Sequence, residues 1–498
     1  MDDGKRAERA VRIVIVGGGI TGLSAAAAAA ARAREVGRSV SITLLEGSGR
    51  LGGNIVTDRV DSFVIDAGPD SWVASKPQAT ALAKDLGLGG AIIGTRQDTR
   101  RYYVVWEGRL HAVPEGIVLG VPTRLAPLVG TRLFTWGSKL RMALEPLVPA
   151  KRYEGDEDES IAAFASRRLG REAADRLVAP LLGGISAGDA NELSVRAAFP
   201  QLVAMENDYG SLTRGMWAAA RKRASAGPEA SKASAFVSLV GGMGALVDAL
   251  HERVRASGVT VRLNTPVRSI ERSTESESAY RVGIENGETI EADAILMAAP
   301  AHAVGSLLGN LDAEAAGRVS TLAYGSTATV FLAYKKSDVH HPLDGVGFVV
   351  PRSLGHPILA STWVSSKWAH RAPEGYVLLR VFFGGPSSEE VLAADDAHLA
   401  TLARRELGTL MNLEGEPLWS RVYRFRRASA QMRVGHLAML RGLRERMSES
   451  APRVLVAGGG YGVTGIPDCI REGQAAGIAM VDMGTARERM GTPLRSAG

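Results

Sequence analysis

The feature that most constrains the fold is a glycine-rich turn between a strand and a helix near the N-terminus. Residues 11–16 (VRIVIV) are mostly β-branched and apolar, which favours a strand buried on both faces of a parallel sheet. GGGITG follows directly, and the alanine-rich stretch 23–34 is expected to be a helix, because alanine is the best helix former. A second apolar stretch, 40–46, is a predicted strand that ends in an acid. This order of elements predicts an α/β unit that binds a dinucleotide.

The residues of this turn have separate expected tasks. Gly17 allows a tight turn, Gly19 lets the backbone approach a pyrophosphate, and Gly22 lets the helix pack on the strand. Glu46 is placed to bind ribose hydroxyls. The next stretch, E-x-x-x-R-x-G-G, adds a basic residue and a second glycine turn, formed by Glu46, Arg50, Gly52 and Gly53. It resembles flavoproteins of two-domain oxidase architecture and not simple NAD dehydrogenases, so we expect FAD.

Composition excludes several classes of protein. The 498 residues are 45% hydrophobic, which is enough chain for about three domains with substantial cores. The single cysteine, Cys469, cannot form a disulfide within the chain, so we expect a cytoplasmic protein. No apolar run is long enough to span a bilayer. The net charge of +6 favours anionic partners, but no dense Lys/Arg run with interleaved aromatics indicates nucleic acid.

The middle of the chain contains segments of contrasting character. Residues 116–150 are apolar with widely spaced basic residues, which fits either a membrane-docking surface or a helical subdomain with its apolar face turned inward. Residues 221–234 are small, polar and broken by proline, so a mobile surface segment is predicted. Two strands flanking Asn286-Gly287 predict a hairpin with a type I′ turn.

Two further glycine-bearing stretches are candidate contacts to a flat ring. Residues 66–70 (DAGPD) form a turn that can bring backbone against it, and the run 458–465 lies between a strand and a helix. The helix N-terminus there suits an electron-rich group such as a flavin edge. An ordinary turn without a ligand is the alternative for both. Cys469 is expected to be a buried structural thiol, and the histidines show no metal spacing, so no metal is predicted.

Taken together, these stretches resemble the FAD-dependent porphyrinogen oxidase family, whose members oxidise protoporphyrinogen IX or coproporphyrinogen III in haem synthesis. The resemblance extends over residues 11–483 and includes VGGGITGL, LEGSGRLGG, AGPDSW and GIPDCI. The segments EGIVLGVPTRLAP, TWVSSKW and GIPDCI resemble the Gram-positive type, which is associated with coproporphyrinogen III.

The resemblance implies an α/β fold with a Rossmann-like FAD-binding domain of the amine-oxidase or glucose-methanol-choline type. That domain is expected to consist of residues 10–85, 236–304 and 451–485. A mixed β-sheet substrate domain would take 86–112 and 305–450, and a helical membrane-facing insertion 113–222. Residues 223–235 would be a linker and 486–498 a tail.

The resemblance also implies site residues. The expected cofactor contacts are Gly17, Gly19, Ile20, Thr21, Gly22, Glu46, Arg50, Gly52, Gly53, Gly68, Pro69, Asp70, Val267, Gly458, Thr464, Gly465 and Ile466. The expected substrate contacts are Lys76 and Arg101 as propionate partners, with Gly184, Ile185, Tyr324, Ser326 and Phe382 around the macrocycle. No side-chain nucleophile is expected, because flavin N5 would accept hydride from a meso carbon.

Three residues depart from the family pattern. Val463 stands where a glycine is usual, Asp66 replaces a glutamate, and Asn54–Thr57 lacks a basic residue that several relatives carry. The implied reaction is three two-electron oxidations with O2 as acceptor. Implied partners are a porphyrinogen, O2, the inner face of a membrane, the next haem-pathway enzyme and a second copy of the chain. Rival functions are another flavin amine oxidase or desaturase, and a non-catalytic flavin-bound tetrapyrrole carrier.

Overall fold

The computed structural model describes residues 9–99, 101–185, 187–225, 234–273, 279–385, 389–463 and 465–483. The expected tail lies outside the described residues, as does most of the expected linker, residues 226–233. Residues 223–225 of that linker are helical, because α10 ends at Ser225.

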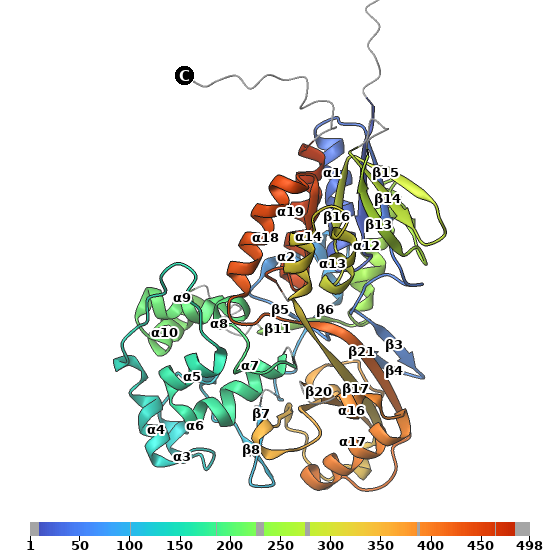
Figure 1. Cartoon of the computed structure of the whole chain (residues 1–498). Coiled ribbons are helices and arrows are strands. Elements are labelled where there is room, and N and C mark those ends of the chain that lie inside the picture. Colours follow the sequence, from blue (N-terminus) through green and yellow to red (C-terminus); the bar gives the residue numbers. More distant parts are fainter. Residues whose placement is uncertain are drawn as a thin grey trace, which may run out of the picture.

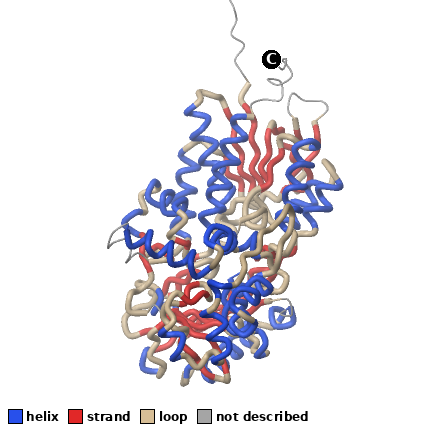
Figure 2. Tube along the Cα trace, turned by 90° about the vertical axis from the view of Figure 1, so that its left-hand side faces the viewer, coloured by secondary structure: helices blue, strands red, loops and turns tan. Residues whose placement is uncertain are grey.

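A five-stranded parallel sheet forms the centre of the first unit (Figure 2). Its strands come from distant parts of the chain because parallel neighbours need crossover connections. In spatial order they are β12 (Thr260–Arg262), β2 (Val40–Leu45), β1 (Val11–Val16), β16 (Ala294–Met297) and β22 (Val454–Val456). Helices α1 (Ile20–Glu35), α2 (Pro77–Asp85), α12 (Gly244–Ala256) and α19 (Ile466–Asp482) pack in the same core. The expected Rossmann-like α/β fold is thus confirmed.

Helices α1 and α19 lie side by side at unusually short range (Figure 1). A Cβ on Gly473 would lie 2.3 Å from the carbonyl oxygen of Thr21, and one on Gly477 would lie 2.2 Å from that of Ala25. Only glycine fits at such backbone-to-backbone contacts. This packing fixes the last glycine run of the chain against the first.

An antiparallel meander adjoins this unit and corrects the predicted hairpin. Its strands are β13 (Val267–Arg272), β14 (Tyr280–Ile284) and β15 (Thr289–Ala292). Gly287 has φ +87°, but Asn286 is not in the left-handed region, so the type I′ prediction is wrong. Gly287 N–H bonds the Ile284 carbonyl and Ile284 N–H bonds that of Glu288. The loop is therefore a three-residue turn with a glycine bulge, which needs only one positive φ.

The second unit is a seven-stranded mixed sheet. In spatial order its strands are β21 (Trp419–Gln431), β17 (Ala323–Lys335), β20 (Tyr376–Gly384), β19 (Ala360–Trp363), β18 (Gly345–Val349), β7 (Arg101–Trp106) and β8 (Arg109–Ala112). Only β18 and β7 pair in parallel. The helices α15 (Val364–Lys367), α16 (Glu389–Ala393) and α17 (Asp396–Met411) accompany it. Three small sheets complete the strands: β3 (Thr57–Val60) with β4 (Phe63–Asp66), β9 (Ile117–Val118) with β10 (Val121–Pro122), and β5 (Trp72–Val73), β11 (Phe236–Leu239) and β6 (Ile92–Gly94).

The third unit is helical and lies beside the second (Figure 1). Its α-helices are α3 (Ala126–Gly130), α4 (Trp136–Ala143), α5 (Ile161–Leu169), α6 (Arg171–Ala173), α7 (Ala179–Ile185), α8 (Val195–Ala198), α9 (Pro200–Tyr209) and α10 (Leu212–Ser225). Ser160 caps α5 by accepting a hydrogen bond from Ala163 N–H.

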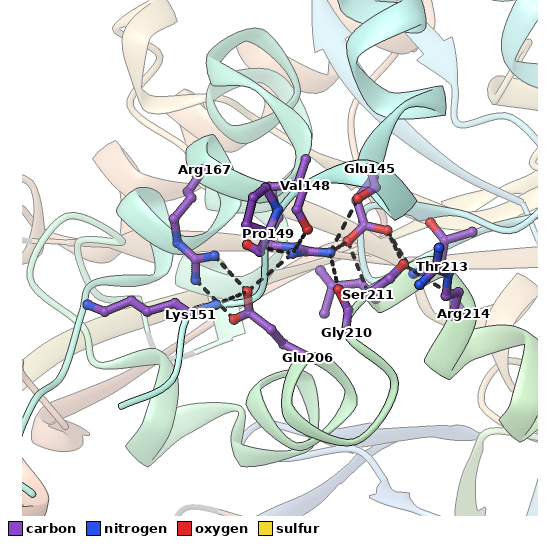
Figure 3. Close-up of polar contacts among 12 residues, drawn as sticks. Glu145, Val148, Pro149, Lys151, Arg167, Glu206, Gly210, Ser211, Thr213 and Arg214 are labelled. Atoms are coloured by element: carbon purple, nitrogen blue, oxygen red, sulfur yellow. Dashed lines mark hydrogen bonds and ion pairs between the residues drawn. The ribbon is translucent and has the colours of Figure 1, made fainter. Parts of the chain in front are cut away.

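A buried ionic cluster ties these helices together (Figure 3). The fully buried guanidinium of Arg168 bonds Glu145, and its Nη1 lies 3.2 Å from Glu206 Oε1. Glu145 also accepts hydrogen bonds from Ser211 Oγ (2.6 Å) and Thr213 N–H (3.1 Å) at the start of α10. Burial opposes ionisation of Glu145, but these donors and Arg168 hold its pKa below the usual value. The charges are therefore compensated within the insertion.

Two helices pack elsewhere than the expected domain boundaries imply. Helices α14 (Ala313–Ser320) and α18 (His436–Ser450) share a core with β1, β16 and α13 (Ala301–Leu308). We therefore propose that the nucleotide-binding unit includes both, and that the substrate unit comprises residues 86–112 and about 323–435. No helix among the described residues is long and apolar enough to cross a membrane.

Candidate active site

The two N-terminal glycine turns meet in space. Gly52 N–H donates to the Gly18 carbonyl at 2.9 Å, and Gly19 pairs with Gly52 in an isolated bridge. Gly17 has φ +110°, and a Cβ there would lie 2.5 Å from the Ala298 carbonyl oxygen. The turn residues predicted from sequence, positions 17–22, are therefore held against positions 52–53.

One glycine of the first turn faces open space. The nearest atom to a Cβ built on Gly19 is Gly53 Cα, at 4.0 Å. No side chain caps α1, and its first turn holds no acid. The first N–H groups of a helix have no partner within it, and they favour an anion. This opening beside Ile20 and Thr21 fits the pyrophosphate of a dinucleotide.

Glu46 and Arg50 both fold onto the turns. Glu46 Oε2 accepts from Gly18 N–H at 2.7 Å, and Oε1 accepts from Ser48 N–H at 2.8 Å and Ser48 Oγ at 2.7 Å. An ionised carboxylate has about four acceptor sites, so one remains for a ribose hydroxyl. Arg50 donates to the Gly53 carbonyl at 2.6 Å, so its guanidinium braces the second turn.

The AGPD turn rests on a buried arginine of the substrate sheet. Arg380 donates to the carbonyls of Ala67 (2.5 Å) and Gly68 (2.8 Å) and is 6% exposed. Burial lowers its pKa to about 10. Gly68 has no room for a side chain, because a Cβ would lie 1.8 Å from the Asn54 carbonyl oxygen. The turn that includes Pro69 is thus rigidly placed.

Two acids of this segment have structural partners. Asp66 accepts from Arg371 at 2.8 Å and from Met243 N–H at 2.8 Å. Asp70 accepts from Lys367 Nζ at 2.7 Å and from Trp368 Nε1 at 2.9 Å. Burial opposes ionisation of Asp70, but Lys367 and Arg380 hold its pKa well below the usual range. Both acids therefore join the first unit to the segment after β19, and the expected role of Asp70 as a cofactor contact stays a prediction.

The last glycine run lies against the first turn. A Cβ on Gly458 would lie 3.0 Å from Thr21 Oγ1. Tyr324 donates through its hydroxyl to the Gly459 carbonyl at 3.1 Å, which joins an expected substrate residue to this loop. Val463 is 7% exposed and packs in the core, so the loop accommodates it. Gly465 is the N-cap of α19, Ile466 its first residue, and Thr464 lies outside the described residues.

Side chains in the first turn of α19 form a charged group beside this loop. Lys76 bonds Asp468, whose other oxygen accepts from Arg471 Nη1 at 2.7 Å. Asp468 is 6% exposed and Gly465 lies within 4 Å of it. Cys469 is buried, and burial raises its thiol pKa to about 11. The geometry therefore supports a structural role for this thiol.

Most expected substrate residues converge at one place. Gly184 is exposed and lies with Ile185 at the end of α7. The turn after α7 contacts the end of β20. A Cβ built on Gly384 of β20 would lie 3.4 Å from Ala187 Cβ in that turn and 3.3 Å from the Ser326 carbonyl oxygen on β17. Phe382 lies two residues earlier on β20, with the Arg380 guanidinium 4.4 Å from its ring centre. The helical insertion, β17 and β20 thus border one site.

Two expected contacts lie apart from that convergence. Arg101 pairs with Gly345 at the start of β18 and donates to Asp344 at 2.9 Å, whereas the convergence adjoins the segment after the end of β18. Five residues of strand span about 16 Å, so the structure does not bring Arg101 to Phe382. Val267 begins β13 at an irregular pairing with Ile284, near the turn that carries Glu46.

Sequence reasoning missed three arginines that organise the site. They are Arg352, Arg371 and Arg380, and each donates to backbone carbonyls of a distant segment. Nothing in the local sequence distinguishes them from surface arginines. Only Arg380 carried a signal, because a charged residue in the apolar stretch YVLLRVFF must find a partner when buried.

These features together define an FAD-dependent oxidoreductase built on two glycine turns. A family model described as flavin containing amine oxidoreductase matches residues 20–477. The coproporphyrinogen III oxidase of Bacillus subtilis is 35% identical over 96% of this chain and 98% of its own length. The protein of the same name from Staphylococcus aureus is 33% identical over 93% of this chain and 97% of its own.

Solved structures agree with this similarity. A crystal structure of a protein from Exiguobacterium sp. 255-15 is 31% identical and has a TM-score of 0.82, covering 96% of this chain and 100% of that chain. Putrescine oxidase, with a TM-score of 0.67 and 17% identity over 95% of this chain and 100% of that chain, shares the fold alone. The chain belongs to the flavin containing amine oxidoreductase family, and within it to the porphyrinogen oxidases. The expected FAD cofactor and oxidoreductase class are confirmed.

Proposed function

We propose that this chain oxidises a porphyrinogen to the porphyrin in haem biosynthesis. The observation that carries the proposal is full-length similarity to proteins named coproporphyrinogen III oxidase, at 32–35% identity over 93–96% of this chain. Supporting it, the expected macrocycle residues converge where three structural units meet, and Tyr324 connects that place to the Gly459 loop.

The residues of the chain position and enclose the reactants. FAD, held by the glycine turns at 17–22 and 52–53, would supply the hydride acceptor for each two-electron oxidation and the route of the electrons to O2, which would give H2O2. Three such steps remove the six electrons that separate a porphyrinogen from a porphyrin. Arg380 fixes the AGPD turn and Tyr324 fixes the Gly459 loop, so positioning supplies the catalysis. Cys469, with its raised pKa, is unsuited to attack.

Coproporphyrinogen III is the substrate that we favour. Relatives with that name are 29–35% identical, and chloroplast protoporphyrinogen oxidases are 28–30% identical, so the two most similar relatives named here carry the coproporphyrinogen name. The net charge of +6 also suits a tetracarboxylate better than a dicarboxylate. Steady-state kinetics on both porphyrinogens test this: equal or higher kcat/KM for protoporphyrinogen IX would overturn it.

Anaerobic mixing tests the reaction itself. The purified FAD enzyme is mixed with coproporphyrinogen III without oxygen, and its flavin absorbance is followed. An oxidase bleaches the flavin within seconds and regains its colour when O2 is admitted. A carrier binds the tetrapyrrole but leaves the flavin oxidised, and an amine oxidase bleaches only with an amine.

A membrane surface is the second partner that we propose. Six exposed apolar side chains lie on or beside α3 and α4, at the outer end of the helical unit (Figure 1): Leu125, Val129, Trp136, Leu140, Leu144 and Leu147. The exposed Arg124 and Arg132 lie in the same segment, whereas Lys139 is buried against Val129. Such a face suits anionic lipid.

Vesicle co-sedimentation tests this face. Vesicles of phosphatidylglycerol should bind the wild type and release most of the L140E/L147E variant, and equal sedimentation of both proteins would refute the assignment. Contact with the next pathway enzyme, and a homodimer, stay predictions.

A further inference from the structure

Arg352 differs from Lys76 and Arg101, the two expected propionate partners, in its lack of an acidic partner among the described residues. Lys76 is bonded to Asp468, and Arg101 is paired with Asp344. Arg380 is buried, and its guanidinium donates to two backbone carbonyls of the AGPD turn. By contrast, no carboxylate lies within 4 Å of Arg352 among the described residues.

The backbone around Arg352 holds it in a defined place. It begins a short 3₁₀ turn, Arg352–Leu354, between β18 and β19, directly after Pro351, whose ring fixes φ. Arg352 Nη2 donates to the carbonyls of Gly188 at 2.9 Å and Ala187 at 3.2 Å. These are in the turn that follows α7, so the guanidinium bridges the helical insertion and the substrate sheet.

The free edge of the guanidinium faces the convergence. A Cβ built on Gly385 would lie 2.9 Å from Arg352 Nη1, so that nitrogen lies against the end of β20. Neither Nη1 nor Nε has an acceptor within the described part of the chain. Nη1 can therefore donate a charge-assisted hydrogen bond to a carboxylate. The residue is exposed, so a ligand can reach it.

The electrostatic setting favours an incoming anion. Burial by its surroundings lowers the pKa of Arg352, an effect that the nearby Asp189 partly offsets. Asp189 is itself occupied, because its Oδ1 accepts from Asn191 N–H at 2.8 Å and from Asn191 Nδ2 at 2.9 Å. A partly desolvated cation gains more from a carboxylate than a hydrated one does.

We propose that Arg352 binds a propionate carboxylate of the porphyrinogen and takes the role that the sequence suggested for Arg101. This rests on the proposed function for the nature of the substrate, and it adds a residue that determines specificity. The carboxylate would sit where the turn after α7 meets the end of β20, with Phe382 beside the macrocycle.

Equilibrium binding tests the proposal apart from turnover. Coproporphyrin III, the oxidised product, is titrated into the oxidised enzyme, and quenching of protein fluorescence gives Kd. The Arg352→Gln variant should weaken binding about tenfold, in keeping with loss of a charge-assisted bond. Arg352→Lys keeps the charge but cannot bond the Gly188 carbonyl and a ligand from one planar group, so its Kd should fall between the two. Arg255→Gln, an exposed arginine of α12, is the matched control and should change Kd less than twofold.

Salt dependence separates ligand contact from mere support of the turn. If Arg352 meets a carboxylate, the slope of log Kd against log salt concentration decreases in Arg352→Gln and is kept in Arg352→Lys. An unchanged slope, or a change in Kd below twofold, overturns the proposal. Flavin absorbance and Tm of each variant report whether the fold and cofactor are retained.

The outcome also distinguishes this proposal from the proposed function. If the wild type binds coproporphyrin III but never bleaches its flavin with the porphyrinogen, the oxidase function fails while the role of Arg352 is still decided by Kd. If turnover is normal and Arg352→Gln binds as the wild type does, only the role of Arg352 fails. If the wild type binds no porphyrin, both fail.

Discussion

Gly19 offers a clean separation of cofactor binding from folding. A Cβ on Gly17 would lie 2.5 Å from the Ala298 carbonyl oxygen, and one on Gly22 would lie 1.9 Å from that of Gly17, so substitutions at either position disrupt the backbone. At Gly19 the nearest atom to a Cβ is 4.0 Å away and φ is −71°, which any residue adopts. Gly19→Val should therefore fold and lose its cofactor.

The magnitude follows from the space that the side chain fills. C–C bonds are about 1.5 Å, so the valine methyl groups extend about 2.5 Å from Cα. In the wild type, a phosphate oxygen bonded to the first N–H groups of α1 would lie about 2.9 Å from each nitrogen. The valine methyl groups would occupy that space, so the oxygen would no longer reach these N–H groups. Loss of two charge-assisted bonds of about 1.5–3 kcal/mol each weakens binding by about 3–6 kcal/mol, or about 10²–10⁴ in Kd.

Two measurements check the Gly19→Val prediction. The ratio of flavin to protein absorbance after purification should fall from near one FAD per chain to a trace. Tm should equal that of FAD-stripped wild type, because cofactor at about 100 times Kd contributes about 2.7 kcal/mol to stability.

A glycine with similar freedom serves as the control. Gly317 in α14 has no atom within 4 Å of its Cβ position, so Gly317→Val should keep full FAD content. A yellow, fully loaded Gly19→Val protein would refute the placement of the pyrophosphate at this turn.

Three predictions concern stability. Arg168→Met leaves the buried Glu145 without its arginine, while Glu206 keeps Arg167, and should cost about 3–5 kcal/mol of unfolding free energy in urea titrations; a cost below about 1 kcal/mol would contradict it. Gly477→Ala puts a methyl group 2.2 Å from the Ala25 carbonyl oxygen and should lower stability by about 1–3 kcal/mol in the same assay. Burial lowers the pKa of His436 to about 4, below its unfolded value of about 6.5, so the unfolded chain binds the proton first. Stability should fall by up to about 3 kcal/mol between pH 6.5 and pH 4, and His436→Asn should flatten Tm over that window.

The nucleotide-binding unit was predictable because its signals are local. The turn at Gly17, the alanine helix and the acid at position 46 all lie within 40 residues, and the strand, turn and helix form as expected, with Glu46 folded onto the turn. The Asn286-Gly287 turn shows the limit of such signals. An Asn-Gly pair is compatible with a type I′ turn and with a three-residue loop that has a glycine bulge. The loop between β14 and β15 is of the second type, which needs a single positive φ.

The substrate site was less predictable because its geometry depends on contacts between distant segments. Gly184, Ser326 and Phe382 lie far apart in the chain, and they meet only because β17 and β20 pair and the turn after α7 docks on them. Arg101 has the right chemistry, yet its strand register puts it at the opposite end of β18. The sequence identifies a cation that suits a carboxylate, but the strand register determines which part of the structure that cation lies beside.

Three arginines that donate to backbone carbonyls help to join the three units, alongside the ion pairs of Asp66 and Asp70. Arg380 holds the AGPD turn, Arg371 holds the Val240 carbonyl, and Arg352 holds the turn after α7. A carbonyl accepts a hydrogen bond without neutralising the charge, and among the described residues Arg352 has no ion pair within 4 Å. Such a junction attracts an anionic ligand as soon as the units assemble. If Arg352 binds a propionate as proposed, the architecture that joins the units also supplies part of the substrate site, without a dedicated cluster of lysines.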